Sequence, residues 1–302
     1  MTDNKSRPNL LLATKILNID IKLKKDSITD ARESKDRNTP SDEDVKLLYR
    51  RLENVTSVLV CGSCRLAVLV GNPDVATSSF SKMSYLVLSS TFKPLKDPFC
   101  PALYFHLHHY TALQRLELVV MRSGDSIHPG PPLPKPPPFL GSIIDFSLEG
   151  PLSTSKDSLH CLLCTLGPLY GLSLVDTAPT SRLPEILAGL DAPRYLRVLG
   201  LDHQSENDIT ASVDLSDNFK TFSTLQTLIL GGSIATTTSS LYSSLDTLPI
   251  RTLAFVERAE VSLPELKLVI TGRTKHKHLS TIHFDHVGGR TGTRINDEMG
   301  PY

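Results

Sequence analysis

The sequence predicts an α/β solenoid, in which a parallel sheet is built from one short strand per repeat and irregular helices join the strands. Two observations lead to this expectation. A pattern of three apolar residues, apolar-x-x-apolar-x-apolar, recurs at steps of about 25 to 30 residues, after a first step of 39 that contains the charged segment 22–44. Between its copies lie segments whose apolar residues are spaced as on one face of a helix. One strand and one helix per step stack into a right-handed solenoid.

The strand pattern occurs ten times, and its regular step carries the argument, because a chain rich in apolar residues also holds such patterns by chance. Its fourth and sixth residues are apolar, which is typical of a strand with one buried face. Four copies share a narrower form, Leu/Ile-Gln/Arg-x-Leu-x-Leu/Phe. The ten copies span residues 16–21, 55–60, 83–88, 113–118, 143–148, 169–174, 196–201, 225–230, 250–255 and 279–284.

Helical spacing is clearest after Ser158, a favourable N-cap, where Leu159, Leu162, Leu163 and Leu166 fall on one face. Further short helices are expected within residues 41–55, 101–110, 184–190 and 241–248. A doubly wound α/β domain also alternates strands and helices, but its strands are apolar throughout. Here the fifth position is often polar or small: Glu117, Ser147, Ser173, Gly200 and His283. The pattern therefore favours one open sheet face.

These repeats resemble a leucine-rich-repeat protein of the irregular, ribonuclease-inhibitor-like kind, and are especially similar to the repeat regions of fungal F-box/leucine-rich-repeat proteins. The resemblance rests on Leu-Arg-Val-Leu-Gly-Leu at 196–201, Leu-Gln-Thr-Leu-Ile-Leu at 225–230 and their counterparts, and covers about residues 13–287. It implies a horseshoe of about nine to ten repeats, with the sheet on the concave face and the helices on the convex face.

The resemblance also implies a protein-binding role, and substrate recognition in an F-box-like ubiquitin ligase as its specific form. Two features depart from the family. The Asn or Cys expected at the ninth position of each repeat is replaced by Ser63, Thr91, Met121, Thr177, Gln204 and Ser233. No F-box is seen before the first strand, so binding of a Skp-type adaptor is doubtful.

Three segments interrupt the repeats. Residues 22–44 are mostly charged, and we expect a disordered insertion, with a phosphorylated regulatory loop as the alternative. Residues 128–141 form a Pro-rich loop, expected to be a stiff connector, although such a stretch could also dock on an SH3 or WW groove. Residues 288–302 are polar and Gly-rich and are expected to be a disordered tail.

Composition excludes several classes of protein. Among 302 residues, 32 Lys and Arg balance 32 Asp and Glu, which excludes a strongly basic nucleic-acid binder. No apolar run reaches the roughly 18 residues of a membrane span, and the first residues are not a convincing signal peptide. We expect a cytoplasmic or nuclear protein without nucleic-acid or membrane partners.

Two pairs of cysteines, Cys61-x-x-Cys64 and Cys161-x-x-Cys164, have the spacing of zinc or redox pairs. They lie several repeats apart, in the wrong register for a zinc ribbon. We therefore expect both pairs to be small core residues.

Residues that could perform chemistry are sparse. His283 and Asp285 share a strand face and could hold a metal with His278, but no HExxH frame supports this. No GxSxG, GxxxxGK[ST] or GxGxxG motif is present either. We expect no enzyme activity, no metal and no cofactor. Two alternatives stay open: an α/β enzyme whose strands imitate repeats, and a truncated product without independent function.

The concave face should carry the partner-binding residues, since it displays the third, fifth and seventh positions of each strand pattern. Its mixture of acidic, small and aromatic residues suits a protein partner, and Tyr85 and Arg115 are of the types that become hot spots. The candidates are Tyr85, Arg115, Glu117, Asp145, Ser147, Glu149, Ser173, Asp202, His283 and Asp285.

Overall fold

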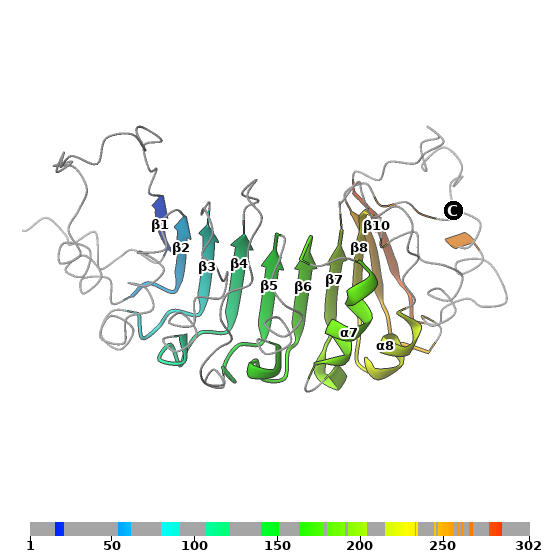
Figure 1. The fold of residues 1–302 in the computed structure, drawn as a ribbon, viewed down its shortest axis with the longest axis horizontal. Coiled ribbons are helices and arrows are strands. Elements are labelled where there is room, and N and C mark those ends of the chain that lie inside the picture. The colour runs from blue at the N-terminus through cyan, green and yellow to red at the C-terminus, as the bar shows by residue number, and fades with distance from the viewer. Residues whose placement is uncertain are drawn as a thin grey trace, which may run out of the picture. The chain divides into compact units, whose positions relative to one another are not determined.

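The computed structural model (Figure 1) describes most of the predicted repeats. The described residues are 16–20, 54–61, 80–90, 107–120, 140–150, 163–177, 180–190, 193–203, 215–232, 234, 245, 247–256, 259, 261, 266–267 and 278–285. The charged insertion at 22–44, the tail at 288–302 and nearly all of the Pro-rich loop at 128–141 lie outside them, as do most residues of the helices expected at 41–55, 101–110 and 241–248.

The chain divides into two compact units, residues 1–142 and 143–302. In each unit the strands pair in parallel and in chain order. The first unit holds β1 (Ile16–Asp20), β2 (Ser57–Cys61), β3 (Tyr85–Ser90) and β4 (Arg115–Val120). The second holds β5 (Asp145–Glu149), β6 (Gly171–Val175), β7 (Val198–Asp202), β8 (Thr227–Gly231), β9 (Thr252–Val256) and β10 (Thr281–Phe284).

This arrangement confirms a strand at each of the ten predicted positions and shows that the doubly wound alternative is wrong. A doubly wound sheet reverses its strand order partway, whereas here each strand pairs with the next strand in the chain within both units. The alternative of an α/β enzyme assumed that the strands only imitate repeats, and it therefore loses its structural basis. A single solenoid over residues 13–287 stays a prediction.

The core consists of rows of apolar side chains that run across the strands. In the second unit the pairing register aligns two such rows, all buried: Phe146, Leu172, Leu199, Leu228 and Leu253, and Leu148, Leu174, Leu201, Leu230 and Phe255. In the first unit Leu86 lies beside Leu116, and Leu88 beside Leu118. One strand per repeat with stacked leucines is the geometry of a leucine-rich-repeat solenoid.

A tight turn precedes several strands and was not anticipated from the sequence. The N–H of the first apolar residue of the pattern donates to the carbonyl three residues earlier, as from Met83 to Phe80 at 2.9 Å and from Leu225 to Phe222 at 3.0 Å. Phe80 and Phe222 are fully buried. The turn therefore adds one more buried residue, three positions ahead of the strand pattern, and fixes the direction in which the strand starts.

Neighbouring repeats are joined where their strands begin. One carbonyl accepts two N–H groups of the next repeat: that of Arg197 accepts from Gln226 at 2.8 Å and from Thr227 at 2.9 Å. The carbonyls of Ser84, Ile144, Tyr170, Gln226 and Arg251 accept the corresponding pairs. This repeated link sets the register on which the apolar rows depend.

Short helices connect the strands of the second unit. The short helices η1 (Thr180–Arg182) and η2 (Pro193–Tyr195) flank α7 (Leu183–Ala188), which confirms the short helix expected here. Its apolar side chains Leu183, Ile186 and Leu187 are buried.

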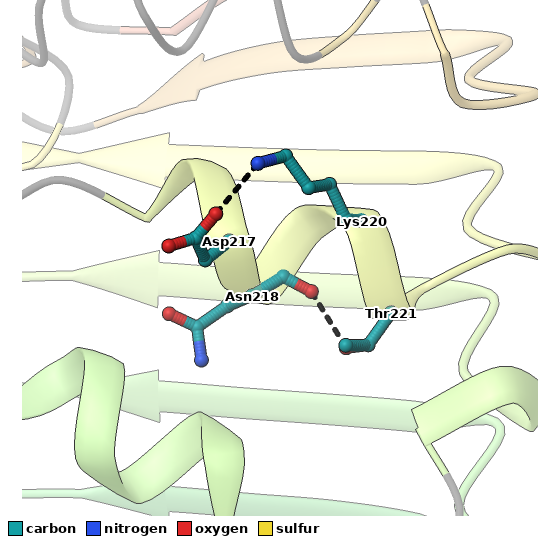
Figure 2. A network of polar contacts seen from close by, with 4 residues as sticks. All are labelled: Asp217, Asn218, Lys220 and Thr221. Carbon is teal, nitrogen blue, oxygen red and sulfur yellow. Dashed lines mark hydrogen bonds and ion pairs between the residues drawn. The ribbon is translucent and has the colours of Figure 1, made fainter.

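A second helix, α8 (Ser216–Thr221), was not predicted. It buries Phe219, and its Asn218 side chain donates to the carbonyl of Pro184 at 2.8 Å, which ties α8 to α7. On its exposed side Lys220 pairs with Asp217 at 2.6 Å, a surface contact that contributes little to stability (Figure 2).

One expectation about the core is wrong. Cys164 is exposed, with its sulfur 3.5 Å from the carbonyl of Gly189. Leu163 and Thr165 on either side of it are buried, so the turn of helix at this point faces Cys164 outward. The side chains of the other four cysteines lie outside the described residues.

The apolar rows should dominate stability. We expect Leu228→Ala to lower the free energy of unfolding by about 2–5 kcal/mol, because the side chain is fully buried between two neighbouring leucines and its loss leaves a cavity. Urea denaturation measures the change. The control is Thr227→Ala, one residue away and facing out of the core, which should alter stability by less than about 0.5 kcal/mol. Equal effects of the two substitutions would contradict the assigned faces.

The end of β8 requires glycine. Gly232 has a φ of 53°, and a Cβ there would collide with the carbonyl oxygen of His203. We expect Gly232→Ala to cost about 1–3 kcal/mol of unfolding free energy. Gly200→Ala is the matched control, because its Cβ would lie 3.2 Å from the rotatable hydroxyl of Ser173, and it should cost clearly less. Thermal unfolding of both variants tests the difference, and a larger loss in Gly200→Ala would contradict it.

Candidate functional site

The strands present an open sheet face, defined here as the strand side chains that alternate with the buried rows. Each of the ten candidate residues occupies such an alternate position, on β3, β4, β5, β6, β7 or β10, or directly after β10. Tyr85, Arg115 and Glu117 belong to the first unit and the other seven to the second. We consider the two units separately.

In the first unit the register brings three of the candidates together as a Tyr85–Arg115–Glu117 cluster. Tyr85 on β3 lies directly beside Arg115 on β4, and Glu117 follows two residues later on the same face. The Tyr85 hydroxyl donates to Glu117 Oε2 at 2.8 Å. The Arg115 guanidinium carbon lies 4.7 Å from the centre of the Tyr85 ring, a cation–π contact. The cluster is thus held in one arrangement before any partner binds.

The cluster remains accessible to solvent. The side chains of Arg115 and Glu117 are 55% and 26% exposed, and their 4.0 Å ion pair is too open to water to contribute much stability. An exposed arginine and an accessible tyrosine, held in fixed positions, lose little conformational freedom when a partner binds.

The electrostatics of Tyr85 favour binding over proton chemistry. Partial burial raises the pKa of its phenol, the hydrogen bond and the charge of Glu117 raise it further, and Arg115 lowers it. A tyrosine used as a base or nucleophile near neutral pH needs a lowered pKa. Tyr85 therefore acts as a hydrogen-bond donor with an aromatic surface.

In the second unit some of the candidate residues, Asp145 and Ser173 among them, lie over glycines. The Asp145 carboxylate occupies the space where a side chain at Gly171 would lie, and Ser173 borders Gly200 in the same way. Ser147 pairs in register with Ser173, and both are partly buried. This part of the open sheet face consequently carries small and polar side chains, and Glu149 is exposed at the end of β5.

Asp202 differs from the other candidates because it is only 8% exposed. Its side chain fills the space above Gly231. An aspartate so covered presents little surface to a partner, and we leave Asp202 out of the proposed binding surface.

A polar cluster at the strand ends was missed by the sequence analysis. The His203 ring lies 3.7 Å from the Asp176 carboxylate, and the Asp176 N–H donates to the carbonyl of Asp202 at 2.9 Å. Asp176 has a φ of 53°, in the left-handed region that aspartate tolerates better than most residues. The signal was present in the sequence, since Asp176 and His203 each directly follow a strand in successive repeats.

The candidates at the last strand do not form a metal site with other described residues. His283 and Asp285 are both exposed, as is His278. Within the described part of the chain, no three His, Cys, Asp or Glu side chains are grouped closely enough to hold a metal ion. The described helices also include none long and apolar enough to cross a membrane.

The sequence analysis also overlooked Tyr170 and Tyr195, which are exposed beside the starts of β6 and β7. They fall outside the third, fifth and seventh positions that the strand pattern marks as surface. The signal available in the sequence was the position of each tyrosine, just ahead of a predicted strand and outside its buried positions.

Comparison with known proteins finds similarity among solved structures. No protein-family model matches the chain, and none of the curated proteins is detectably similar. Among solved structures the chain is similar to the leucine-rich repeat-containing protein LegL7 from Legionella pneumophila, with a TM-score of 0.46 and 17% identity over 80% of this chain and 78% of that chain. The assignment of the repeat fold rests on this chain's own strands and apolar rows.

The Tyr85 phenol should titrate above the usual tyrosine pKa of about 10. We expect Glu117→Gln to lower that pKa, because the substitution removes the negative charge that disfavours tyrosinate. The absorbance of tyrosinate against pH gives the measurement, and Tyr85→Phe identifies the signal among eight tyrosines. No change of the Tyr85 pKa in Glu117→Gln would contradict the cluster.

The same shift has a consequence for stability. The folded state holds the Tyr85 proton more tightly than the unfolded chain does, so the raised pKa adds to the free energy of unfolding. This added stability is complete below about pH 10 and is lost as the pH rises from there through the folded-state pKa.

Proposed function

We propose that the chain is a non-catalytic protein-binding module that recognises a protein partner through its open sheet face. The observation that carries the proposal is the Tyr85–Arg115–Glu117 cluster: an accessible aromatic ring, a guanidinium and a carboxylate, fixed relative to one another on adjacent strands. Tyrosine and arginine are enriched among the residues that dominate protein–protein binding energy.

The chemistry of the face supports a protein partner over a nucleic acid. Acidic side chains, those of Glu117, Asp145, Glu149 and Asp285, outnumber Arg115 among the candidate residues. A phosphate backbone needs a run of cations and would be repelled by this set. These candidate residues match a protein surface with both charged and apolar groups better than they match a nucleic acid.

The placement of polar groups supports a binding role over catalysis. Apart from the Tyr85–Arg115–Glu117 cluster, the candidate side chains are distributed along separate strands, one register position after another. Nucleophilic and acid–base catalysis need several such groups within hydrogen-bond reach of one reacting atom. Tyr85, with its raised pKa, is unsuited to proton abstraction near neutral pH.

The more specific hypothesis is that the module selects substrates for an F-box-like ubiquitin ligase. It rests on the resemblance of the sequence pattern to the repeats of fungal F-box/leucine-rich-repeat proteins. Affinity purification of the tagged chain from its own cells tests it. Stoichiometric recovery of a Skp-type adaptor and a cullin would support the ligase hypothesis, and recovery of a different partner alone would remove it while keeping the binding module.

Once a partner is purified, its affinity tests the role of the open sheet face. We expect Arg115→Ala and Tyr85→Ala each to raise the dissociation constant roughly tenfold or more, since hot-spot truncations cost about 2 kcal/mol or more. Gln114→Ala is the matched control, because Gln114 is exposed and adjacent to Arg115 but precedes the strand. Unchanged affinity in both cluster variants, with folding intact, would contradict the proposal.

The truncated-product alternative gives a different result. Recovery of chaperones only, together with gradual unfolding without a cooperative transition, would favour a chain that does not fold by itself.

A further inference from the structure

An exposed apolar patch lies where β6 and β7 begin. Among residues whose burial the structure describes, the large hydrophobic side chains that stay exposed are Tyr170, Tyr195 and Val198, at 41%, 42% and 40%. All three belong to two adjacent repeats, and Val198 is itself on the open sheet face. Single exposed apolar residues are normal, but three of them within two adjacent repeats are a candidate interaction site.

Two arginines complete this patch, which we call the Tyr–Arg patch: Tyr170, Arg194, Tyr195, Arg197 and Val198. The guanidinium carbon of Arg197 lies 4.9 Å from the centre of the Tyr170 ring, and that of Arg194 lies 5.1 Å from the centre of the Tyr195 ring. Both arginines are exposed, and neither forms an ion pair with a carboxylate in the described part of the chain. Two positive charges therefore stand next to exposed apolar surface.

The backbone beneath the patch is fixed. The N–H groups of Arg197 and Val198 donate to the carbonyl of Tyr170 at 2.8 and 3.0 Å. The hydroxyl of Thr224, in the next repeat, lies within hydrogen-bond distance of the carbonyls of Arg194 and Leu196, between which it shares its single proton. Because the backbone from Arg194 to Val198 is held in this way, a ligand that binds the side chains above it orders little additional backbone.

The charges around the patch limit what it can bind. On the open sheet face the nearest described carboxylate by register is that of Asp145, whose side chain extends from β5 over Gly171, the register partner of Val198, and Glu149 lies further along β5. A phosphate strand that continued past the two arginines would meet these carboxylates. A short acidic group flanked by apolar residues makes use of the arginines without extending over β5.

We propose that the Tyr–Arg patch binds an acidic, apolar-flanked segment of the protein partner. A carboxylate of the segment would accept hydrogen bonds from Arg194 or Arg197, and its apolar side chains would cover the tyrosine rings and Val198. The inference rests on the proposed function and names the chemistry of the segment that the module recognises.

Random peptides displayed against the full chain provide the test. We expect the selected peptides to be enriched in Asp or Glu next to aliphatic or aromatic residues. The affinity of a selected, fluorescently labelled peptide should fall with added salt, because exposed charges are screened. The double variant Arg194→Ala/Arg197→Ala should weaken binding roughly tenfold or more.

Arg251→Ala is the matched control, because Arg251 is exposed and occupies the position of Arg197 two repeats later. It should bind the peptide as the wild type does. Arg197→Glu provides a second test of charge recognition, since reversal of the charge should shift the selected peptides toward those with Lys or Arg. Unfolding curves confirm that these exposed substitutions leave the fold intact.

Two kinds of result would overturn the inference about the Tyr–Arg patch, and they can be distinguished from a failure of the proposed function. Selection of peptides without acidic residues, or equal affinity of the double variant and the wild type, would show that the patch is not the acidic-segment site. If Arg115→Ala still weakened binding of the purified partner, the open sheet face would remain the binding surface. Tighter binding of a labelled single-stranded oligonucleotide than of any peptide would assign the patch to nucleic acid and also overturn the inference.

Discussion

The parallel register between successive strands is the constraint on which the rest of the structure depends. It is set where each strand begins, by one carbonyl that accepts two N–H groups from the next repeat, as that of Arg197 does from Gln226 and Thr227. With the register fixed, Leu199 and Leu228 fall into one buried row, and the alternate residues must face the other way. A slip by a single residue would exchange the two faces, so core and binding surface are determined by the same hydrogen bonds.

That coupling explains why the candidate residues come together without special loops. Tyr85 and Arg115 are 30 positions apart in the sequence but adjacent in register, and Glu117 completes the cluster two residues later. The Tyr–Arg patch arises in the same way, because Tyr170 and Arg197 precede successive strands and stack across the repeat boundary. Contacts of this kind recur with the repeat, and each pair of neighbouring repeats can present different chemistry on an unchanged scaffold.

Much of the fold could be predicted from the sequence, and the failures have physical reasons. Alternation of apolar residues at a regular step is a strong signal, and it located each strand that the structure describes. It could not show that Asp202 is covered, because burial at the open face depends on small neighbours such as Gly231. The helix α8 was missed because its apolar residues, Leu215, Phe219 and Phe222, extend beyond a six-residue helix into its flanks. Tyr170 lies outside the alternating positions, where the strand pattern carries no information about exposure.

The central claim is that the open sheet face, and not the helical side, contacts the protein partner. Side-chain labelling with hydroxyl radicals, with and without the purified partner, tests it most directly. We predict that Tyr85 loses reactivity in the complex, while the exposed side of α8 around Lys220 stays as reactive as in the free chain. Protection around Lys220 with no change at Tyr85 would contradict the claim.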